Sequence, residues 1–313
     1  MATAPEARGL LDDVALLDTL VITHDTIVES VHFLSSDPPA SVGWKLVAVN
    51  LSDLAAKGAT PRAALLSLTI WGDGAWEDGF LSGVEAACES YALPLIGGDT
   101  VALPAGAPRV LGMTAIGRAG PNTPERAGGR GGDALWVVGT LGDSAEGLAQ
   151  LRADAKATGA LVDVYRRPIP QLGAGQLIAP HAHAMMDVSD GLLLDAQRLA
   201  EASGCAAEID LDALPLSDGF AESRGRGLEA RLFAATAGDD YALLAALPPE
   251  IDPATLSLPQ GTTIARIGRL VAGTPRIAVA SGGVPVELPE TLGFEHQSDQ
   301  HRPLSDPPMV DRP

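Results

Sequence analysis

The clearest hydrophobic pattern in the chain predicts one long helix over residues 38–57. Apolar side chains recur there at intervals of three and four, which is typical of a helix with one buried face. These residues are Trp44, Val47, Leu51 and Leu54. Gly58 and then Pro61 follow, and glycine just past the last turn with proline beyond it is a common way for a helix to end.

The rest of the chain alternates between short apolar runs, which predict strands, and longer amphipathic segments, which predict helices. The expected strands are residues 14–17, 20–24, 62–71, 93–96, 110–117, 134–138, 184–188, 207–211, 241–247, 263–270 and 276–280. The other expected helices are residues 75–91, 142–153, 171–179, 192–203 and 217–230. Because strands and helices mix in both halves, we predict an α/β (α+β) protein of two domains.

A segment rich in proline and glycine, residues 121–132, is the predicted linker between the domains. We expect an N-terminal domain over residues 1–120, with a mixed sheet flanked by helices. The C-terminal domain, residues 133–296, is expected to be an α+β sandwich. Residues 297–313 are rich in proline and aspartate, and we predict a disordered tail there.

Asp53 is the unusual residue of the long predicted helix. It lies little more than one turn before the C-terminus, where the helix dipole disfavours a carboxylate by roughly 0.3–1 kcal/mol. Lys57, four residues further on, would offset much of that cost as an ion pair. A bound cation would have the same effect. From the helix alone, both interpretations of Asp53, as half of a surface ion pair and as a metal ligand, are open.

Composition narrows the class of protein. The chain has 313 residues, of which 46% are hydrophobic, enough for two domains with real cores. Its net charge of −19 argues against a surface for nucleic acid or for an anionic membrane. No apolar run is long enough to span a membrane, and residues 1–8 lack the apolar core of a signal peptide. With Cys88 and Cys205 far apart, no zinc cluster is expected, and a reducing cytoplasm is the simplest location.

Aspartates gather where the predicted strands end. They are Asp12, Asp13, Asp25, Asp99, Asp187 and Asp190. Each one alone is explained as a turn residue or a helix cap. These aspartates together with Asp53 indicate a site of hard oxygen ligands, which select Mg²⁺ over zinc or copper. Magnesium held by several carboxylates is typical of phosphate chemistry.

The common nucleotide motifs are absent, since the chain has neither Walker A glycine spacing nor the motifs of a protein kinase. If ATP binds, metals and backbone amides must hold its phosphates. The turn at residues 139–144 would offer amides at a helix start, or it is an ordinary helix cap. His32 lies close to the acidic loops, where it either contacts an anion or forms a hydrogen bond at a strand edge.

Taken together, these motifs resemble the thiamine-monophosphate kinase family, within the superfamily of aminoimidazole ribonucleotide synthetase. The similarity extends from about Leu10 to Phe294. It is carried by the segments at residues 11–17, 25–33, 50–59, 95–100, 139–144, 186–192 and 237–243. The resemblance implies ATP-dependent phosphorylation of thiamine monophosphate to thiamine diphosphate, with several Mg²⁺ ions and a homodimer in which the N-terminal sheets pair.

The resemblance also implies roles for individual residues. The implied metal ligands are Asp13, Thr23, Asp25, Asp53, Asp99, Asp187 and Asp190. The implied contacts to ATP are Gly98, Asp99, Arg126 and Ser189. The implied contacts to the substrate are His32, Asp239 and Phe294. No covalent catalytic residue is expected, because the attacking phosphate oxygen is already ionised and the expected reaction is direct in-line transfer.

Three positions depart from the family pattern. Leu10-Leu11 replaces the usual Ile-Gly before the first aspartate pair, His24 replaces a hydroxyl residue, and Asp239 replaces glutamate. Two alternatives therefore stand beside the kinase. One is another ATP-dependent enzyme of the superfamily, of the purine-pathway synthetase type, and the other is an inactive acidic metal-binding protein.

Overall fold

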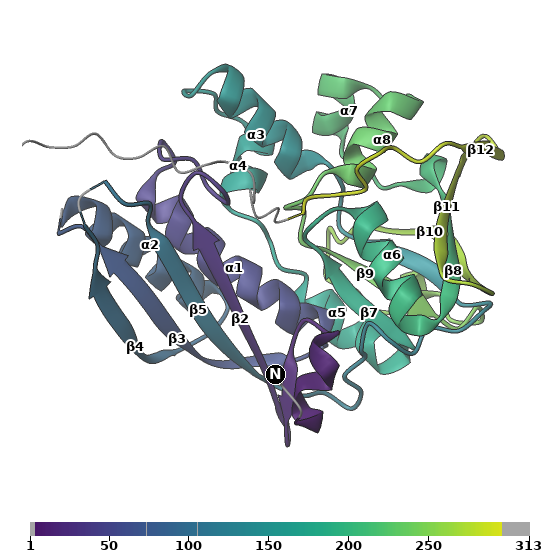
Figure 1. The fold of residues 1–313 in the computed structure, drawn as a ribbon, viewed down its shortest axis with the longest axis horizontal. Helices are drawn as coiled ribbons and strands as arrows, with labels where there is room; N and C mark the ends of the chain where they lie inside the picture. Colours follow the sequence, from purple (N-terminus) through teal and green to yellow (C-terminus); the bar gives the residue numbers. More distant parts are fainter. Residues whose placement is uncertain (1–3, 73, 105, 296–313) are drawn as a thin grey trace, which may run out of the picture.

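The N-terminal domain is a five-stranded sheet with two helices packed on one face (Figure 1). The computed structural model describes residues 4–72, 74–104 and 106–295. The strand order is β1-β2-β5-β3-β4, in which only β3 and β4 pair in parallel. The elements are β1 Ala15–Leu17, β2 Leu20–Val28, α1 Pro39–Ala56, β3 Thr60–Ile70, α2 Ala75–Ser90, β4 Leu95–Ala102 and β5 Val110–Arg118.

Helix α1 is the centre of the molecule, and all but three of its 18 residues are buried. The sequence predicted one buried face, and the structure corrects this because α1 is covered by the sheet, by α2 and by the C-terminal domain. Small residues allow the close contacts. A Cβ at Gly43 would lie 2.1 Å from the Phe80 carbonyl of α2, and one at Gly175 would lie 2.1 Å from the Ala55 carbonyl.

The C-terminal domain contains a seven-stranded sheet of order β12-β11-β8-β10-β6-β9-β7. Its strands are β6 Ala134–Val138, β7 Ala184–Val188, β8 Cys205–Asp210, β9 Ala242–Leu247, β10 Ile264–Ala272, β11 Arg276–Ser281 and β12 Val284–Val286. Its helices are α3 Asp143–Ala153, α4 Ala160–Arg166, α5 Leu172–Ile178, α6 Leu192–Ser203, α7 Asp218–Arg224 and α8 Leu228–Thr236. The predicted α/β class is confirmed, with a mixed sheet in each half.

Strands β6, β7 and β9 are buried on both faces. One face packs under α6 and α8, and the other packs against α5 and the C-terminal end of α1. Met185 of β7 belongs to the second group. Because strand side chains alternate between faces, Asp187 points to the same side as Met185, toward α1. This alternation places the carboxylate of Asp187, a residue of the C-terminal domain, against the N-terminal domain.

Several predicted boundaries differ from the structure. Strand β4 was predicted to end at Ile96, but it continues to Ala102, so Asp99 lies within the strand. Strand β2 likewise runs past Asp25 to Val28. The helix predicted at 217–230 is two helices, α7 and α8, since Gly225 breaks it with φ +81°. Helix α4 and strand β12 were not predicted. The proposed tail, residues 297–313, lies outside the described residues.

Within the described part of the chain, no helix is both long enough and apolar enough to cross a membrane. Between β5 and β6 the described chain forms no helix or strand. We retain residues 121–132 as the proposed linker.

Candidate functional site

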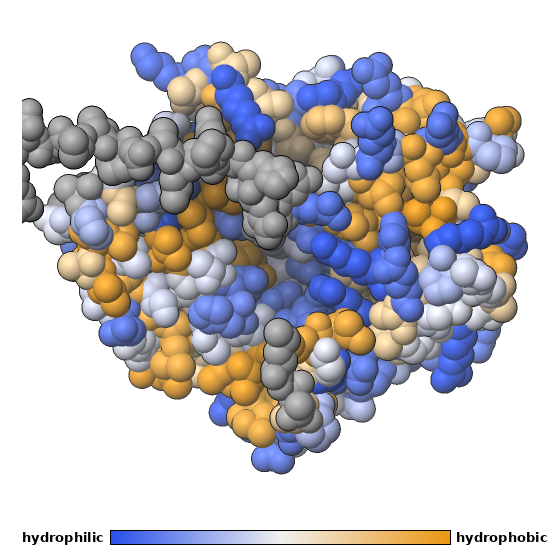
Figure 2. All heavy atoms as spheres, in the orientation of Figure 1, coloured by the Kyte–Doolittle hydropathy of each residue, from blue (hydrophilic) through white to orange (hydrophobic). Residues whose placement is uncertain are grey.

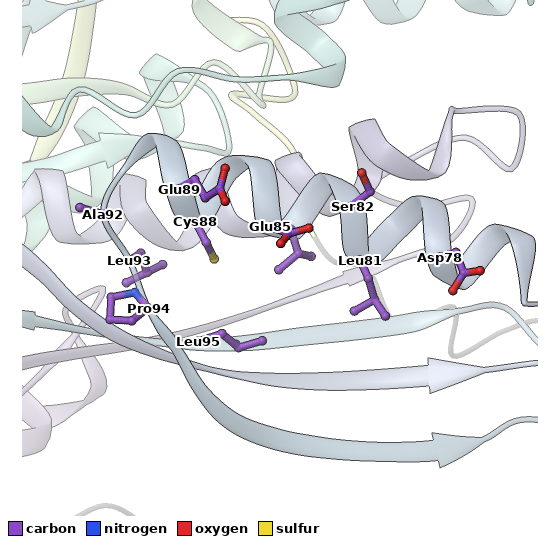
Figure 3. A pocket seen from close by; sticks show the side chains of 11 residues that line it. Asp78, Leu81, Ser82, Glu85, Cys88, Glu89, Ala92, Leu93, Pro94 and Leu95 are labelled. Carbon is purple, nitrogen blue, oxygen red and sulfur yellow. The ribbon is translucent and has the colours of Figure 1, made fainter.

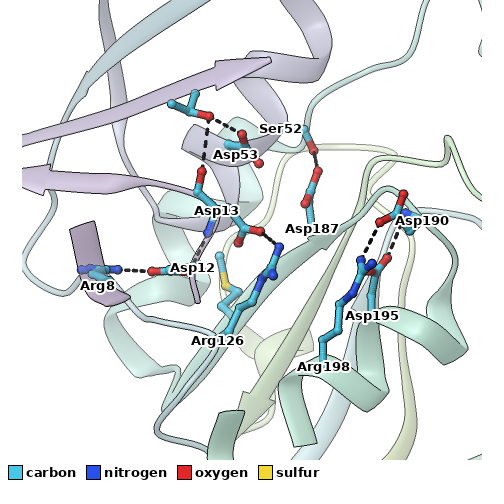
Figure 4. Close-up of polar contacts among 12 residues, drawn as sticks. Arg8, Asp12, Asp13, Ser52, Asp53, Arg126, Asp187, Asp190, Asp195 and Arg198 are labelled. Atoms are coloured by element: carbon cyan, nitrogen blue, oxygen red, sulfur yellow. Dashed lines mark hydrogen bonds and ion pairs between the residues drawn. The ribbon is translucent and has the colours of Figure 1, made fainter. Parts of the chain in front are cut away.

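Three aspartates from different parts of the chain, with largely buried side chains, meet where the two domains face each other (Figure 4). Asp13 precedes β1, Asp53 lies in the last turn of α1, and Asp187 belongs to β7. One carboxylate oxygen from each lies within 4.8 Å of the other two. Six of the seven sequence-predicted ligands form or surround this cluster, because Asp25 and Asp190 line the same cavity and Thr23 is hydrogen-bonded to Asp53.

Hydroxyl groups hold two of these carboxylates in place. The Thr23 hydroxyl of β2 donates a hydrogen bond to Asp53. The Ser52 hydroxyl of α1 donates to Asp187 Oδ2 at 2.8 Å and so links the two domains. Asn50, one turn earlier on α1, accepts a hydrogen bond from the Asp25 amide at 3.1 Å. The segment 50–53 therefore positions carboxylates on both sides of the domain interface.

The electrostatics show that this cluster lacks positive charge to balance its carboxylates. Burial, together with the charges of neighbouring aspartates, raises the pKa values of Asp53 and Asp187 well above the ordinary range. The same causes raise the pKa of Asp25 to about 6. Burial also acts to raise the pKa of Asp13, but Lys57 and Arg126 outweigh it, so this pKa is lowered. Unpaired carboxylates crowded in this way are suited to a cation.

Lys57 does not pair with Asp53, so the surface ion pair considered from the sequence is wrong. Its ammonium is fully buried and lies 2.6 Å from Asp12 Oδ1 and 2.9 Å from Asp13 Oδ2. It also donates to the Met185 carbonyl at 3.0 Å. Asp53 therefore belongs to the three-carboxylate cluster, where the Thr23 hydroxyl donates a hydrogen bond to it.

The cluster opens into a cavity of about 500 Å³ between the domains. Figure 2 shows hydrophilic residues gathered in the hollow between the two halves of the molecule. The cavity is lined by five further residues that the sequence singled out. They are Arg126, Ser189, His32, Asp239 and Phe294. The fold thus brings these metal, ATP and substrate candidates of the two domains to one space.

Asp239 is held by residues that the sequence analysis missed. Its carboxylate pairs with the buried Lys45 of α1, and it accepts hydrogen bonds from Ser144 at 3.0 Å and Tyr241 at 2.8 Å. Lys45 in turn lies 4.2 Å from the centre of the Tyr165 ring. The only available sequence signal was that Lys45 is one of three lysines in the chain and lies two turns before Asp53 on the same helix.

The two histidines near the acidic segments face different ways. His32 lines the cavity, and its Nδ1 accepts a hydrogen bond from the Val28 amide at 3.0 Å. That bond places the proton of the neutral ring on Nε2, which is then a donor. His24 lies on the opposite face of β2, with its Nδ1 2.9 Å from the Thr114 hydroxyl. It points away from the acidic cluster.

Gly98 and Asp99 are not brought to the cluster within one chain. They lie on the edge strand β4, with β5 and β3 between them and Asp25 on β2. Across the sheet, Asp99 of β4 pairs with Ser67 of β3, Ser67 pairs with Gly112 of β5, and Gly112 pairs with Thr26 of β2. This row of residues faces away from α1. Two strands and the thickness of the sheet therefore separate Asp99 from Asp53.

A second groove lies between α2 and the start of β4 (Figure 3). It is lined by apolar residues such as Leu81, Leu93 and Leu95, with the carboxylates of Asp78, Glu85 and Glu89 also lining it. In Figure 3 these carboxylates are spread along the helix and do not converge. This groove offers no catalytic constellation, unlike the cavity between the domains.

Comparison with known proteins agrees with this geometry. Residues 11–119 match the N-terminal domain of AIR synthase related proteins, and residues 130–280 match the C-terminal domain. The thiamine-monophosphate kinase of Escherichia coli is 37% identical over 303 residues, covering 92% of this chain and 91% of the relative. The chain belongs to the thiamine-monophosphate kinase family.

Other thiamine-monophosphate kinases are similar along nearly the whole chain. The Caulobacter vibrioides protein is 37% identical, covering 93% of this chain and 86% of its own. The solved structure of AaThiL complexed with AMPPCP and TMP has a TM-score of 0.80 and 32% identity. It covers 93% of this chain and 94% of that chain. The family resemblance carried by the sequence motifs is confirmed.

Proposed function

We propose that the protein phosphorylates thiamine monophosphate to thiamine diphosphate, with ATP as the phosphoryl donor. The observation that carries this is the meeting of Asp13, Asp53 and Asp187 at a cavity between the domains. The chain has the same fold, over most of its length, as the AaThiL structure complexed with AMPPCP and TMP. A site for two phosphate-bearing substrates needs positive charge at their meeting point, and a cluster of carboxylates supplies it by holding metal ions.

The donor set supports Mg²⁺ as the resident ion. Its members are carboxylate and hydroxyl oxygens, which Mg²⁺ prefers as ligands. Asp13, Thr23, Asp25, Asp53, Asp187 and Asp190 would hold the metal. Mg²⁺ bound there would neutralise charge on the phosphates. Ser52 and Thr23 orient Asp187 and Asp53 for this purpose.

The protein itself positions the reactants. Arg126 and Ser189 are proposed to contact ATP, since Arg126 reaches the cluster at Asp13 and both residues line the cavity. His32, Asp239 and Phe294 are proposed to contact thiamine monophosphate. The Asp239 side chain is shorter than the glutamate usual in the family, and its contacts with Lys45, Ser144 and Tyr241 fix its position. We propose direct in-line transfer. The attacking phosphate oxygen is ionised at neutral pH, so positioning rather than proton removal limits the step.

We propose that the enzyme is a homodimer joined through its N-terminal sheets. No described helix covers the face that carries Asp99, and β4 is a sheet edge exposed along its whole length. Exposed apolar residues of the sheet, Leu65, Ile96 and Val101, are typical of a surface that is buried in an assembly. In such a dimer, Gly98 and Asp99 would contribute to the site of the partner.

Both cysteines are free, in keeping with the reducing cytoplasm we propose for the enzyme.

A substrate comparison tests the function. Purified protein with Mg-ATP is offered thiamine monophosphate or formylglycinamidine ribonucleotide, and ADP release is followed with a coupled assay. We expect ADP with thiamine monophosphate, together with equimolar thiamine diphosphate. ADP formed only with the ribonucleotide would assign the purine-pathway alternative. Labelled phosphate trapped on the protein during turnover would contradict direct transfer.

A further inference from the structure

Lys57 is a buried cation built into the wall of the carboxylate cluster. Its side chain is fully buried, and it is fixed by three oxygen atoms from two domains. Asp12 is fixed in the same way, since Arg8 Nη1 lies 2.5 Å from its Oδ2 while Lys57 holds its Oδ1. A lysine ammonium has three donors, so the oxygen of Asp12, the carboxylate of Asp13 and the carbonyl of Met185 fill its surroundings.

Asp13 belongs to two groups at once. It is a member of the three-carboxylate cluster, and its Oδ2 lies 2.9 Å from Lys57 Nζ. Arg126 is the other cation on Asp13, but 24% of its side chain is exposed, so it can swing into the cavity when a ligand arrives. Lys57 has no exposed surface and no such freedom. Any metal ion that binds Asp13 must therefore share this carboxylate with a fixed positive charge.

We infer that Lys57 is a resident counter-ion that competes with divalent cations at Asp13 and so sets how much Mg²⁺ the enzyme requires. This rests on the metal site proposed above. Like charges that share one carboxylate in a buried place repel strongly, because little water screens them. Without metal, Lys57 keeps the cluster from unfolding under its own negative charge. With metal, the same charge weakens binding.

A purely orienting role for Lys57 predicts the opposite effect on metal binding. If Lys57 only orients Asp13, then removing it would weaken metal binding, because the ligand would lose its position. If Lys57 competes, removing it would tighten metal binding while destabilising the metal-free protein. Metal affinity and metal-free stability therefore move in opposite directions only for a competing cation.

The test uses metal-free full-length protein titrated with MgCl₂ alone, by thermal melting and by isothermal titration calorimetry. For Lys57→Met we expect a lower melting temperature without metal, and half-saturation at a Mg²⁺ concentration roughly tenfold below that of the parent. Lys45→Met removes the other buried lysine, which lies on α1 and pairs with Asp239. It should destabilise the protein without changing the half-saturating Mg²⁺ concentration. Lys156→Met, at an exposed site, should change neither.

Should Lys57→Met fail to fold without metal, Asp12→Asn is added to it so that a carboxylate is removed together with the lysine. This double variant should also bind Mg²⁺ more tightly than the parent. Unchanged or weaker Mg²⁺ binding in the folded variants, with normal binding in the parent, would overturn the competition alone. No response of the parent to Mg²⁺ would overturn the metal site and the inference together.

Discussion

At the scale of single residues, the main feature is an aspartate at the wrong end of a helix. The dipole disfavours Asp53 there, and its burial beside Asp25, Asp187 and Asp13 raises its pKa far above the ordinary value. In the metal-free protein the Asp53 carboxylate is therefore a source of instability. A site that binds cations can tolerate this, because the bound cation removes the repulsion.

Asp53→Asn should raise the melting temperature of the metal-free protein by about 2–4 °C, because a neutral amide of the same shape ends the repulsion. The same variant should gain less stability than the parent when Mg²⁺ and nucleotide are added. Differential scanning fluorimetry measures both shifts. Equal ligand-induced shifts in parent and variant would mean that Asp53 does not bind metal.

Asp195, on α6 beside Asp190, gives a prediction about pH. Burial and the charge of Asp190 raise its pKa to about 7. Between the unfolded pKa near 4 and this value the folded state binds more protons than the unfolded state, so stability falls as pH rises. In EDTA, the melting temperature should drop between pH 5 and pH 8, and Asp195→Asn should make this drop smaller. An unchanged slope in the variant would exclude Asp195 as its source.

At the scale of elements, strand alternation decides which candidates meet. Asp187 turns toward α1 because it shares a face with Met185, whereas Asp99 turns away from α1 because it pairs with Ser67. The sequence motifs predicted both aspartates as ligands. The side of the sheet on which Asp99 lies depends on the length of β4, which extends to Ala102, and on its register with β3. Neither can be read from a short apolar segment that is followed by two glycines.

The elements themselves were mostly predictable from their apolar patterns, and α1 shows the limit. A periodicity of three and four identified the helix, but burial on every side depends on glycines in other segments, such as Gly175. The partners of Lys57 were equally hidden, because Asp12 lies 45 residues away in the sequence and Met185 lies 128 residues away. Spacing within a helix predicts neighbours on that helix only.

The open face of the N-terminal sheet yields a prediction at this scale. Val101 lies on that face of β4, paired with Thr69. Val101→Glu would place a charge in the proposed dimer interface, which should shift the protein from dimer to monomer and lower its activity. Sedimentation velocity measures the change. The matched control is Val284→Glu on β12, an exposed valine of the C-terminal domain, which should leave the dimer intact. A Val101→Glu variant that stays dimeric would exclude this interface.

At the scale of the whole molecule, the two domains form one cavity and a second copy is proposed to complete it. Asp99→Asn and Asp53→Asn should each be inactive alone. If Asp99 acts on the site of the partner, then mixed dimers of the two variants contain one intact site. Refolding or exchanging them together should restore about a quarter of the parent activity per chain. No recovery in verified mixed dimers would place Asp99 in the site of its own chain.

Formation of thiamine diphosphate, measured by chromatography with Mg-ATP and thiamine monophosphate, tests the proposed activity most simply. We predict product from the parent that disappears when EDTA removes the metal. Asp53→Asn should lower the rate at least about 100-fold while its circular dichroism spectrum stays unchanged. No product from the parent, or an unchanged rate in Asp53→Asn, would contradict a kinase built around the carboxylates of Asp13, Asp53 and Asp187.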